Sequence, residues 1–379
     1  MTGTADILVI GGGIAGVSAA ARLAPDARVI VLEREPAIGY HATGRSAAIF
    51  IANYGNATLR ALNAVSGPEL DAPDFVDGSL LSPRGEMLVA TEDELPALER
   101  HLAESTGVER LTPDEAVALV PVLRRDLVRA AALERDARDI DVDRLLQGFA
   151  RRLRAHGGRV VTDAGAERIA WTGGVWRVET GTGVFEAPVL VNAAGAWADV
   201  VAGMAGVAPV GLVPMRRSAA ILPAPPGHDV DHWPLVVSAS ETWYAKPEAG
   251  KLLVSPADED PVEPHDTWPD DMVLAEGLDR FERMTTVEVT RVERSWAGLR
   301  SFVADRSPAV GFAPDAERFF WLAGQGGYGV QTSPALSRLA ADLVLARTPA
   351  LPAAVVAALD PGRAGIGPGS GKSPIDREM

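Results

Sequence analysis

The stretch Asp6–Glu33, DILVIGGGIAGVSAAARLAPDARVIVLE, contains the pattern that decides the fold. Apolar residues at 7–10 predict a short buried strand, the run 14–23 predicts a helix, and apolar residues at 29–32 predict a second strand. Between the first strand and the helix stands GGGIAG, which has the spacing G-x-G-x-x-G. This order predicts a dinucleotide-binding βαβ unit, and a glycine-rich turn without a nucleotide is the alternative.

The glycines and the terminal acid of this stretch have separate roles in such a unit. Gly11 permits the tight turn, Gly13 lets the backbone approach a pyrophosphate, and Gly16 lets the helix pack closely on the strand. The pyrophosphate is expected at the helix N-terminus, where free N–H groups and the helix dipole favour anions. Glu33 is placed to accept hydrogen bonds from an adenosine ribose, and an acid there favours FAD or NAD over NADP.

Length and composition exclude several classes of function. The 379 residues suffice for two domains, or for one large nucleotide domain with an insertion. The formal net charge of −15 argues against nucleic acid as a partner, because phosphate binding requires a basic surface. The absence of cysteine excludes disulfides and thiol chemistry, and the six histidines show no metal-ligand spacing, so no metal is expected.

No apolar run approaches the roughly eighteen uncharged residues of a membrane-spanning helix. The apolar N-terminus lacks the basic region of a signal peptide and is already used as the first strand. We therefore expect no transmembrane segment and a cytoplasmic location.

The remaining chain predicts more of the nucleotide domain and a second, antiparallel sheet. Helices are expected over 56–65, 113–119, 141–156, 269–284 and 333–347. Strands are expected over 80–90 with a turn at 83–86, and over 159–162, 166–171, 175–180, 187–192, 215–222, 235–246, 251–255 and 319–323.

Several separated motifs together resemble a known family. GGGIAG with Glu33, YHATGRSAA, VNAAGAW, GLRSF and GQGGYGVQTS resemble the FAD-dependent amine oxidoreductases related to D-amino acid oxidase, glycine oxidase and sarcosine oxidase. The resemblance runs from Asp6 to about Leu359. Within that group, LLSPRGEM, VPVLRRD, RRSA and WAGLRSFVAD look most like the bacterial FAD-dependent D-arginine dehydrogenases.

The resemblance implies an α/β fold with two domains. A Rossmann-like FAD-binding domain is assembled from residues 1–80, 140–208 and 296–360. A substrate-binding domain, with an antiparallel β-sheet and flanking helices, comes from residues 81–139 and 209–295. Residues 361–379 are rich in glycine and proline, so we expect a flexible tail.

The resemblance also implies FAD, and small residues after the strands suit a backbone pressed against it. We expect the FAD to be non-covalent, although His41 aligns loosely with the histidine that some dimethylglycine dehydrogenase relatives link to flavin. An ordinary polar loop is the alternative for residues 34–48. The expected cofactor residues are Gly11, Gly13, Ile14, Ala15, Gly16, Glu33, Arg34, His41, Thr43, Gly44, Arg45, Ser46, Ala47, Ala166, Ala194, Gly195, Trp197, Gly298, Gly326, Gly327, Tyr328, Gly329, Gln331 and Thr332.

Two arginines are expected to bind the substrate carboxylate. The guanidinium groups of Arg217 and Arg300 match a carboxylate in a bidentate fork, and a structural ion pair is the alternative for each. Arg216 and Arg217 face opposite ways in a strand, so only one of them should enter the site. Gly327 is expected to offer its carbonyl to the substrate amine.

The rest of the expected substrate pocket follows from the resemblance. Tyr54 and Tyr244 match tyrosines that line the family's pocket, unless they are core tyrosines. Glu86 matches the acid that faces a basic side chain in the arginine-type enzymes, and an exposed turn carboxylate is its alternative. Ile49 stands where those enzymes carry a histidine, which leaves the substrate amine without a titratable partner there and puts the preferred substrate in doubt.

The expected reaction is oxidation of a D-amino acid by hydride transfer from its α-carbon to flavin N5. The imino acid formed is then hydrolysed to a 2-oxo acid and ammonia. Glu86 favours a basic substrate similar to D-arginine or D-lysine, and the electron acceptor is a quinone or oxygen. The alternatives are a glycine or sarcosine oxidase-like activity on small or N-methylated amines, and a non-catalytic FAD-binding subunit.

Overall fold

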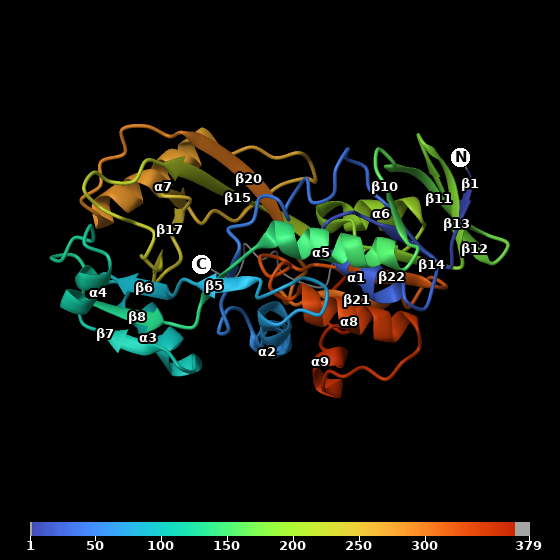
Figure 1. Ribbon diagram of the computed structural model, residues 1–379, viewed down its shortest axis with the longest axis horizontal. Helices are drawn as coiled ribbons and strands as arrows, with labels where there is room; N and C mark the ends of the chain where they lie inside the picture. The colour runs from blue at the N-terminus through green and yellow to red at the C-terminus, as the bar shows by residue number, and fades with distance from the viewer. Residues whose placement is uncertain (1, 368–379) are drawn as a thin grey trace.

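The computed structural model describes residues 2–367 of the chain. Figure 1 shows two regions side by side, one built around a parallel sheet with β2, β14 and β22 and the other around a mostly antiparallel sheet with β15, β17 and β20. Segments from the beginning, middle and end of the chain meet in the first region. The predicted α/β fold is therefore confirmed.

The parallel sheet positions the glycine turn. Its six strands lie in the order β10-β3-β2-β14-β22-β21, and only β21 runs antiparallel to its neighbour. β2 and β3 are buried along their whole length, as expected for strands covered on both faces. The strands are β10 (Arg159–Val161), β3 (Val29–Leu32), β2 (Ile7–Ile10), β14 (Val189–Asn192), β22 (Phe319–Ala323) and β21 (Ala309–Phe312).

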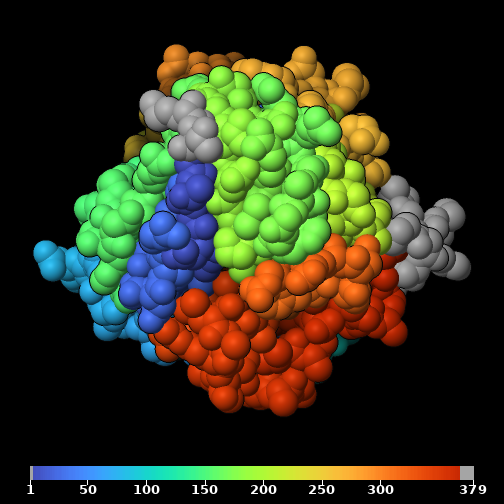
Figure 2. Space-filling model, turned by 90° about the vertical axis from the view of Figure 1, so that its right-hand side faces the viewer, coloured from blue at the N-terminus to red at the C-terminus, as the bar shows by residue number. Residues whose placement is uncertain are grey.

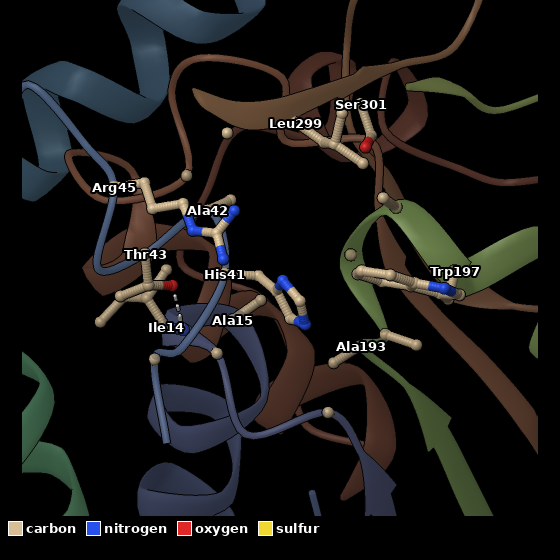
Figure 3. Close-up of a pocket in the computed structure, with 18 of the residues that line it drawn as sticks. Ile14, Ala15, His41, Ala42, Thr43, Arg45, Ala193, Trp197, Leu299 and Ser301 are labelled. Atoms are coloured by element: carbon tan, nitrogen blue, oxygen red, sulfur yellow. Dashed lines mark hydrogen bonds between the residues drawn. The ribbon is translucent and has the colours of Figure 1, made fainter. Parts of the chain in front are cut away.

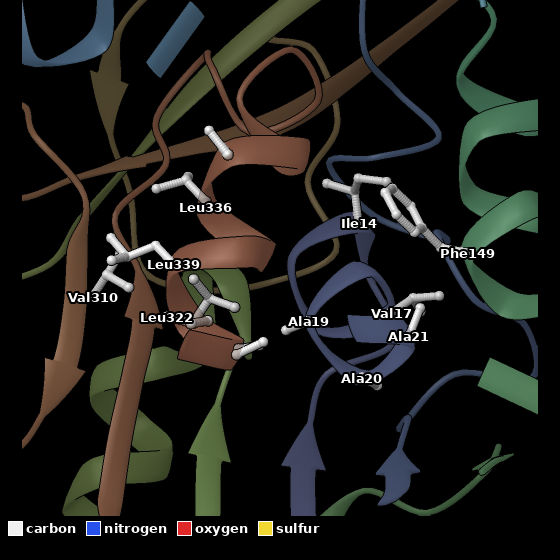
Figure 4. Packing of buried hydrophobic residues seen from close by; sticks show 14 of the residues in the cluster. Ile14, Val17, Ala19, Ala20, Ala21, Phe149, Val310, Leu322, Leu336 and Leu339 are labelled. Atoms are coloured by element: carbon white, nitrogen blue, oxygen red, sulfur yellow. The ribbon is translucent and has the colours of Figure 1, made fainter. Parts of the chain in front are cut away.

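Helix α1 (Ile14–Leu23) packs between two other helices on one face of this sheet. On the side that faces α8 (Ser333–Val344), α1 presents the small residue Ala19, and this lets the two helices approach closely. Figure 4 shows Ala19 directed toward Leu336 and Leu339 of α8. On the other side of α1, its Ile14 meets Phe149 of α5 (Val142–Ala155). The core thus fixes the N-terminus of α1 above the ends of the strands.

A separate, smaller sheet was predicted only in part from the sequence. The predicted hairpin is β11 (Ala166–Thr172) and β12 (Val175–Thr180), which pair antiparallel. The strand predicted over 187–192 is wrong at its start, because Ala187 ends the separate strand β13 (Gly183–Ala187). β13 pairs with β1 (Thr2–Thr4), with Thr2 opposite Val184, and Figure 2 shows these blue and green segments side by side on one face.

The mostly antiparallel sheet carries the other half of the site. Its order is β19-β15-β18-β17-β16-β6-β8-β7, with β20 paired on β15. The single strand predicted over 235–246 is wrong, because residues 239–243 form a turn between β16 and β17. The strands are β19 (Asp260–Pro261), β15 (Val213–Leu222), β18 (Lys251–Ser255), β17 (Tyr244–Glu248), β16 (Leu235–Ser238), β6 (Glu86–Ala90), β8 (Ala130–Glu134), β7 (Glu109–Leu111) and β20 (Arg294–Phe302).

The segment predicted as one interrupted strand over 80–90 belongs to two sheets. β6 joins the large sheet, while β5 (Leu81–Pro83) pairs with β9 (Arg138–Ile140), which also pairs with β4 (Ile49–Phe50). The expected domain boundary at residue 296 falls inside β20, whose pairing with β15 extends the large sheet to Phe302.

Among the remaining helices, α3, α4, α6 and α7 pack on the sheets, and α2 packs on α8. The helices expected at 113–119 and 269–284 are α4 and α7, and α4 begins with the capping box Thr112–Glu115. The helices other than α1, α5 and α8 are α2 (Ala57–Asp71), α3 (Leu95–Glu104), α4 (Pro113–Leu119), the 3₁₀ turn η1 (Gly195–Trp197), α6 (Ala198–Met204), α7 (Asp271–Met284) and α9 (Ala353–Ala357). Of the expected flexible tail, Arg363 donates hydrogen bonds to Asp305 and to the Ser307 carbonyl, and 368–379 lie outside the described residues.

Candidate functional site

A cavity of about 660 Å³ lies where the parallel strands end and extends to the large sheet. Ile10, Glu33 and Ala193, at the carboxyl ends of β2, β3 and β14, all line it. Because β3 and β14 lie on opposite sides of β2, this is the point where the strand order reverses, and ligands of such sheets bind there. The volume is within the range of pockets that take small molecules and cofactors.

The glycine turn forms one wall of the cavity. Gly11 has a φ of 111°, and a Cβ on it would lie 2.3 Å from the Ala193 carbonyl oxygen. A Cβ on Gly16 would lie 2.0 Å from the Gly11 carbonyl oxygen, so both positions require glycine. Gly13 gives α1 no side-chain cap, which leaves the helix N-terminus facing the cavity.

Hydrogen bonds to the backbone fix two side chains around this turn. Glu33 accepts hydrogen bonds from Gly12 N at 2.6 Å and Glu35 N at 2.8 Å, which fixes the carboxylate at the end of β3. Thr43 Oγ1 accepts a hydrogen bond from Ile14 N at 3.0 Å, the dashed line in Figure 3. A dinucleotide fits these residues, because the glycines clear its pyrophosphate and Glu33 can meet a ribose.

Aromatic and basic side chains from two loops narrow the middle of the cavity. Figure 3 shows His41 directed toward Trp197, and their ring centroids are 4.7 Å apart. The Arg34 guanidinium lies 5.0 Å from the Trp197 ring centroid, so this indole contacts both a cation and the His41 ring. Arg45 donates hydrogen bonds to the Thr267 and Ala297 carbonyls, which ties its loop to the large sheet.

The large sheet closes the far end of the cavity with one of its faces. Arg217 lies opposite Gly298, and Met215 lies opposite Arg300, so the two arginines share a face of the β15–β20 pair. The same register places further cavity residues on this face, namely Ala219, Tyr244, Leu253 and Trp296. Arg216 points the other way and pairs with Asp260 at 2.7 Å, as the alternation along β15 predicts.

Arg300 is a charged group held by tyrosines. Its Nη1 donates a hydrogen bond to the Tyr54 hydroxyl at 3.3 Å, and Tyr54 packs on Tyr328 with ring centroids 4.8 Å apart. Burial by itself lowers the pKa of Arg300, but Tyr54, Tyr244 and Glu259 more than offset it, so the pKa lies above its usual value. The guanidinium is therefore a permanent cation at the cavity wall.

Arg217 is a second cation, and it already has partners. Its Nε donates to the Asp258 carbonyl at 2.8 Å, and its Nη2 donates to Glu259 Oε1 at 3.0 Å. Sequence reasoning missed Glu259. The only signal was the acidic run at 258–260, and which acid reaches Arg217 depends on how β19 aligns with β15.

Glu86 is buried on the cavity face of the sheet and does not itself line the cavity. It lies opposite Leu235, and the register from Val237 to Tyr244 places Leu235 on the face that carries Tyr244. Only 7% of Glu86 is exposed, and among the described residues nothing donates a hydrogen bond to its carboxyl. Burial, then the charges of Glu134 and Glu241, raise its pKa to about 8.

A short segment connects Glu86 to the arginines. Glu134, directly opposite Glu86 on β8, accepts hydrogen bonds from Ala52 N at 2.9 Å and Asn53 Nδ2 at 2.7 Å. Tyr54, two residues after Ala52, meets Arg300. The segment from Ala52 to Tyr54 therefore links the surroundings of Glu86 to Arg300.

Most of the predicted residues surround this one cavity. Those that line it are Gly11, Gly13, Ile14, Ala15, Glu33, Arg34, His41, Thr43, Arg45, Ser46, Ala47, Ala166, Ala194, Gly195, Trp197, Arg217, Tyr244, Gly298, Arg300, Gly326, Gly327 and Gly329. Those that do not line it are Gly16, Gly44, Ile49, Tyr54, Glu86, Tyr328, Gln331 and Thr332.

Several residues of the second group support the walls from behind. Gln331 Nε2 donates to Asn63, and its Oε1 accepts from Ile51 N, so its amide is used within the core. Thr332 Oγ1 donates to the Tyr328 carbonyl, and Gly44 N donates to the Gly39 carbonyl at 2.8 Å. Ile49 packs against the apolar cluster that contains Tyr244 and Leu253, where it adds apolar surface.

The glycine turn, Glu33 and the cavity together define a dinucleotide-dependent enzyme site, and comparisons with known proteins specify its class. Residues 6–343 match the DAO family, described as FAD dependent oxidoreductase. Glycine oxidase of Bacillus licheniformis is 24% identical over 366 residues, which cover 90% of this chain and 93% of that protein. Mitochondrial sarcosine dehydrogenase of Homo sapiens is 26% identical over 342 residues, which cover 84% of this chain and 37% of that protein.

A solved structure shows the same fold. Glycine oxidase from Geobacillus kaustophilus superposes with a TM-score of 0.82 at 24% identity, and the match covers 95% of this chain and 99% of that one. The chain belongs to the DAO family of FAD-dependent oxidoreductases, and FAD is its cofactor. The predicted family is confirmed, while the closer resemblance to D-arginine dehydrogenases stays a prediction. Within residues 2–367, no helix has the length and apolar character to span a bilayer.

Proposed function

We propose that this enzyme oxidises the carbon–nitrogen bond of an amino acid, with a D-amino acid of basic side chain as the preferred substrate. The product is an imino acid, which water hydrolyses to a 2-oxo acid and ammonia. One observation carries the proposal: Arg217 and Arg300 enter, from one face of the large sheet, the same cavity that the glycine turn enters from the other side.

The arginines supply binding and orientation. Two guanidinium groups on adjacent strands match a single α-carboxylate, and their hydrogen bonds restrict how the α-carbon can lie. When bound, FAD supplies the redox chemistry by accepting a hydride from that carbon. Since the electrons go to the cofactor, the protein needs to hold the amine neutral and oriented rather than provide a strong base. Gly327, whose backbone lies at the cavity beside Arg300, is the expected acceptor for the amine.

Glu86 supports a basic side chain. Its carboxyl is buried near the far end of the substrate region without a cationic partner among the described residues. A guanidinium or ammonium reaching past Tyr244 would provide that partner, because a buried charge is stabilised by an opposite charge.

A second candidate activity is oxidation of glycine or of an N-methylated amine. The likeness to glycine oxidase over nine-tenths of the chain favours it. In that activity the region around Ile49 and Tyr244 would hold only a small substituent, and Glu86 would have no role in binding.

One experiment separates these functions. The FAD-loaded protein is mixed anaerobically with D-arginine, D-lysine, their L-enantiomers, D-leucine, glycine and sarcosine, and loss of the oxidised flavin's visible absorbance is followed. Fastest reduction by D-arginine or D-lysine supports the main proposal. Reduction only by glycine, sarcosine or L-amino acids overturns it, and a flavin that no amine reduces points to a non-catalytic FAD-binding subunit.

A further inference from the structure

An acidic side chain of the protein, that of Glu259, lies behind the carboxylate end of the cavity, the end where Arg217 and Arg300 line it. Its Oε1 accepts hydrogen bonds from Arg217 Nη2 and Arg306 Nη2 at 3.0 Å each, and Oε2 accepts from Arg306 at 3.0 Å. Arg306 in turn lies over the Phe302 ring, 3.8 Å from its centroid. Glu259 does not line the cavity, so it contacts Arg217 from outside the cavity wall.

The backbone around Glu259 is anchored on both sides. The buried Asp258 carboxylate accepts hydrogen bonds from Ser218 N at 2.6 Å and Ser218 Oγ at 2.8 Å. On the other side, β19 pairs with Met215 and Arg216 of β15. These contacts hold Glu259 beside Arg217 whether or not a ligand is bound.

Among the described residues, the bonds made by Arg217 leave one end of its guanidinium without a partner. Nε and Nη2 form one edge of the planar group, and this edge is taken by the Asp258 carbonyl and by Glu259. The remaining donors are those of Nη1 and the second N–H of Nη2, which together form the end of the fork. A carboxylate in the cavity is therefore met by the end of the Arg217 guanidinium.

Glu259 also changes the charge of this end. Arg217, Arg300 and Arg306 carry three positive charges, and Glu259 cancels one of them. The electrostatic effect reaches Arg300 as well, because Glu259 is among the groups that raise the pKa of Arg300. A second carboxylate near Arg217 would face this fixed negative charge.

Building on the proposed function, we propose that Glu259 is the positioning residue of the carboxylate end. It directs the free end of Arg217 into the cavity and limits this end to ligands with a single carboxylate. Substrates whose second carboxylate lies close to the first, such as aminomalonate-like or iminodiacid compounds, are disfavoured for this reason.

The test compares two ligands of similar size, propionate and malonate, bound to the FAD-loaded protein. Binding is followed through the change in the visible flavin spectrum, so no turnover is needed. In Glu259→Gln, which removes the charge, we expect the Kd of malonate to fall about tenfold and that of propionate no more than about threefold. In Glu259→Ala, which also removes the anchor of Arg217, we expect the Kd of propionate to rise about tenfold.

Asp260→Asn is the matched control, because Asp260 is the neighbouring acid that pairs with Arg216 on the opposite face of β15. It should leave both dissociation constants within about twofold. The melting temperature of each variant separates binding from folding, and Glu259→Gln suffices if the alanine variant does not fold. An unchanged malonate-to-propionate ratio in Glu259→Gln, or the same shift in Asp260→Asn, overturns the inference. If neither ligand perturbs the flavin of the unaltered protein, the proposed function itself fails as well.

Discussion

The two ends of the proposed substrate region, the arginine end and the Glu86 end, stabilise their ionisable side chains in opposite ways. At the arginine end, Arg217 is paired with Glu259, and Arg300 is bonded to Tyr54. At the other end, Glu86 is buried beside a second carboxylate, Glu134, and its pKa is raised to about 8. The first end has its partners without a ligand, whereas no described residue pairs with Glu86, and in the proposed function its partner comes from the substrate. The arginine end should therefore determine whether any amino acid binds, and Glu86 which one.

The largest effect is expected at the organised end, from Arg300→Met. Removing one of the two half-buried guanidinium groups that would bind the carboxylate should lower kcat/KM for every amino acid by about a thousandfold, roughly 4 kcal/mol. Arg300→Lys keeps the charge without the planar fork and should recover only part of the loss. Steady-state kinetics with D-arginine and D-leucine measure both.

Arg216→Lys is the control for these variants, because Arg216 lies on the opposite face of β15 and does not line the cavity. Its kcat/KM should stay within about twofold of the unaltered enzyme. Equal losses in Arg216→Lys and Arg300→Met would contradict the assignment of the carboxylate end.

How far the sequence predicted these regions also differs. β2, α1 and β3 were predicted to the residue, because the glycine turn and the apolar runs are local signals. Pairings between distant segments were not, since β1 joins β13 and β20 joins β15 through contacts that no local pattern encodes. The sequence did not predict that 235–246 forms two strands, because the turn between them contains neither glycine nor proline.

The same distinction applies to the site. Arg217 and Arg300 were expected from the family resemblance and from the match of a guanidinium to a carboxylate, and the structure brings both to the cavity. Glu259 was missed because its role depends on the register of a two-residue strand, and Gln331 was expected at the flavin although its amide bonds to Asn63 and Ile51. Side-chain partners fixed by tertiary register cannot be inferred from composition or spacing.

A smaller effect on KM, which depends on the substrate's side chain, is expected from changing Glu86. Glu86→Gln keeps the shape of the side chain but cannot bind a cation as an ion pair. We expect KM for D-arginine to rise by about ten- to a hundredfold, because a hydrogen bond to a charged group contributes roughly 1.5–3 kcal/mol. D-leucine, measured in the same variant, is the internal control and should change by less than about threefold. A parallel rise for both substrates would mean that Glu86 supports the fold rather than recognising the side chain.

The smallest effect is the pH dependence of that selectivity. Below about pH 8 the Glu86 carboxyl is protonated in the free enzyme, so a basic substrate must displace a proton in order to pair with it. KM for D-arginine divided by KM for D-leucine should therefore fall as pH rises, by at most about tenfold per unit, and level off above the pKa. The ratio cancels the ionisation of the α-amine that both substrates share, and Glu86→Gln should abolish the slope.

The pH dependence of protein stability independently checks the direction of the Glu86 pKa shift. Because the pKa of Glu86 is raised from 4.5 to about 8 on folding, the protonated carboxyl favours the folded state at low pH, and this contribution is lost as pH rises through the folded pKa. The free energy of unfolding of the unaltered enzyme should thus fall, relative to Glu86→Gln, between pH 4.5 and about 8. Urea unfolding of both proteins across this range measures the difference. A difference that stays constant with pH would show that Glu86 is ionised throughout and already paired, which would remove the contrast between the two ends.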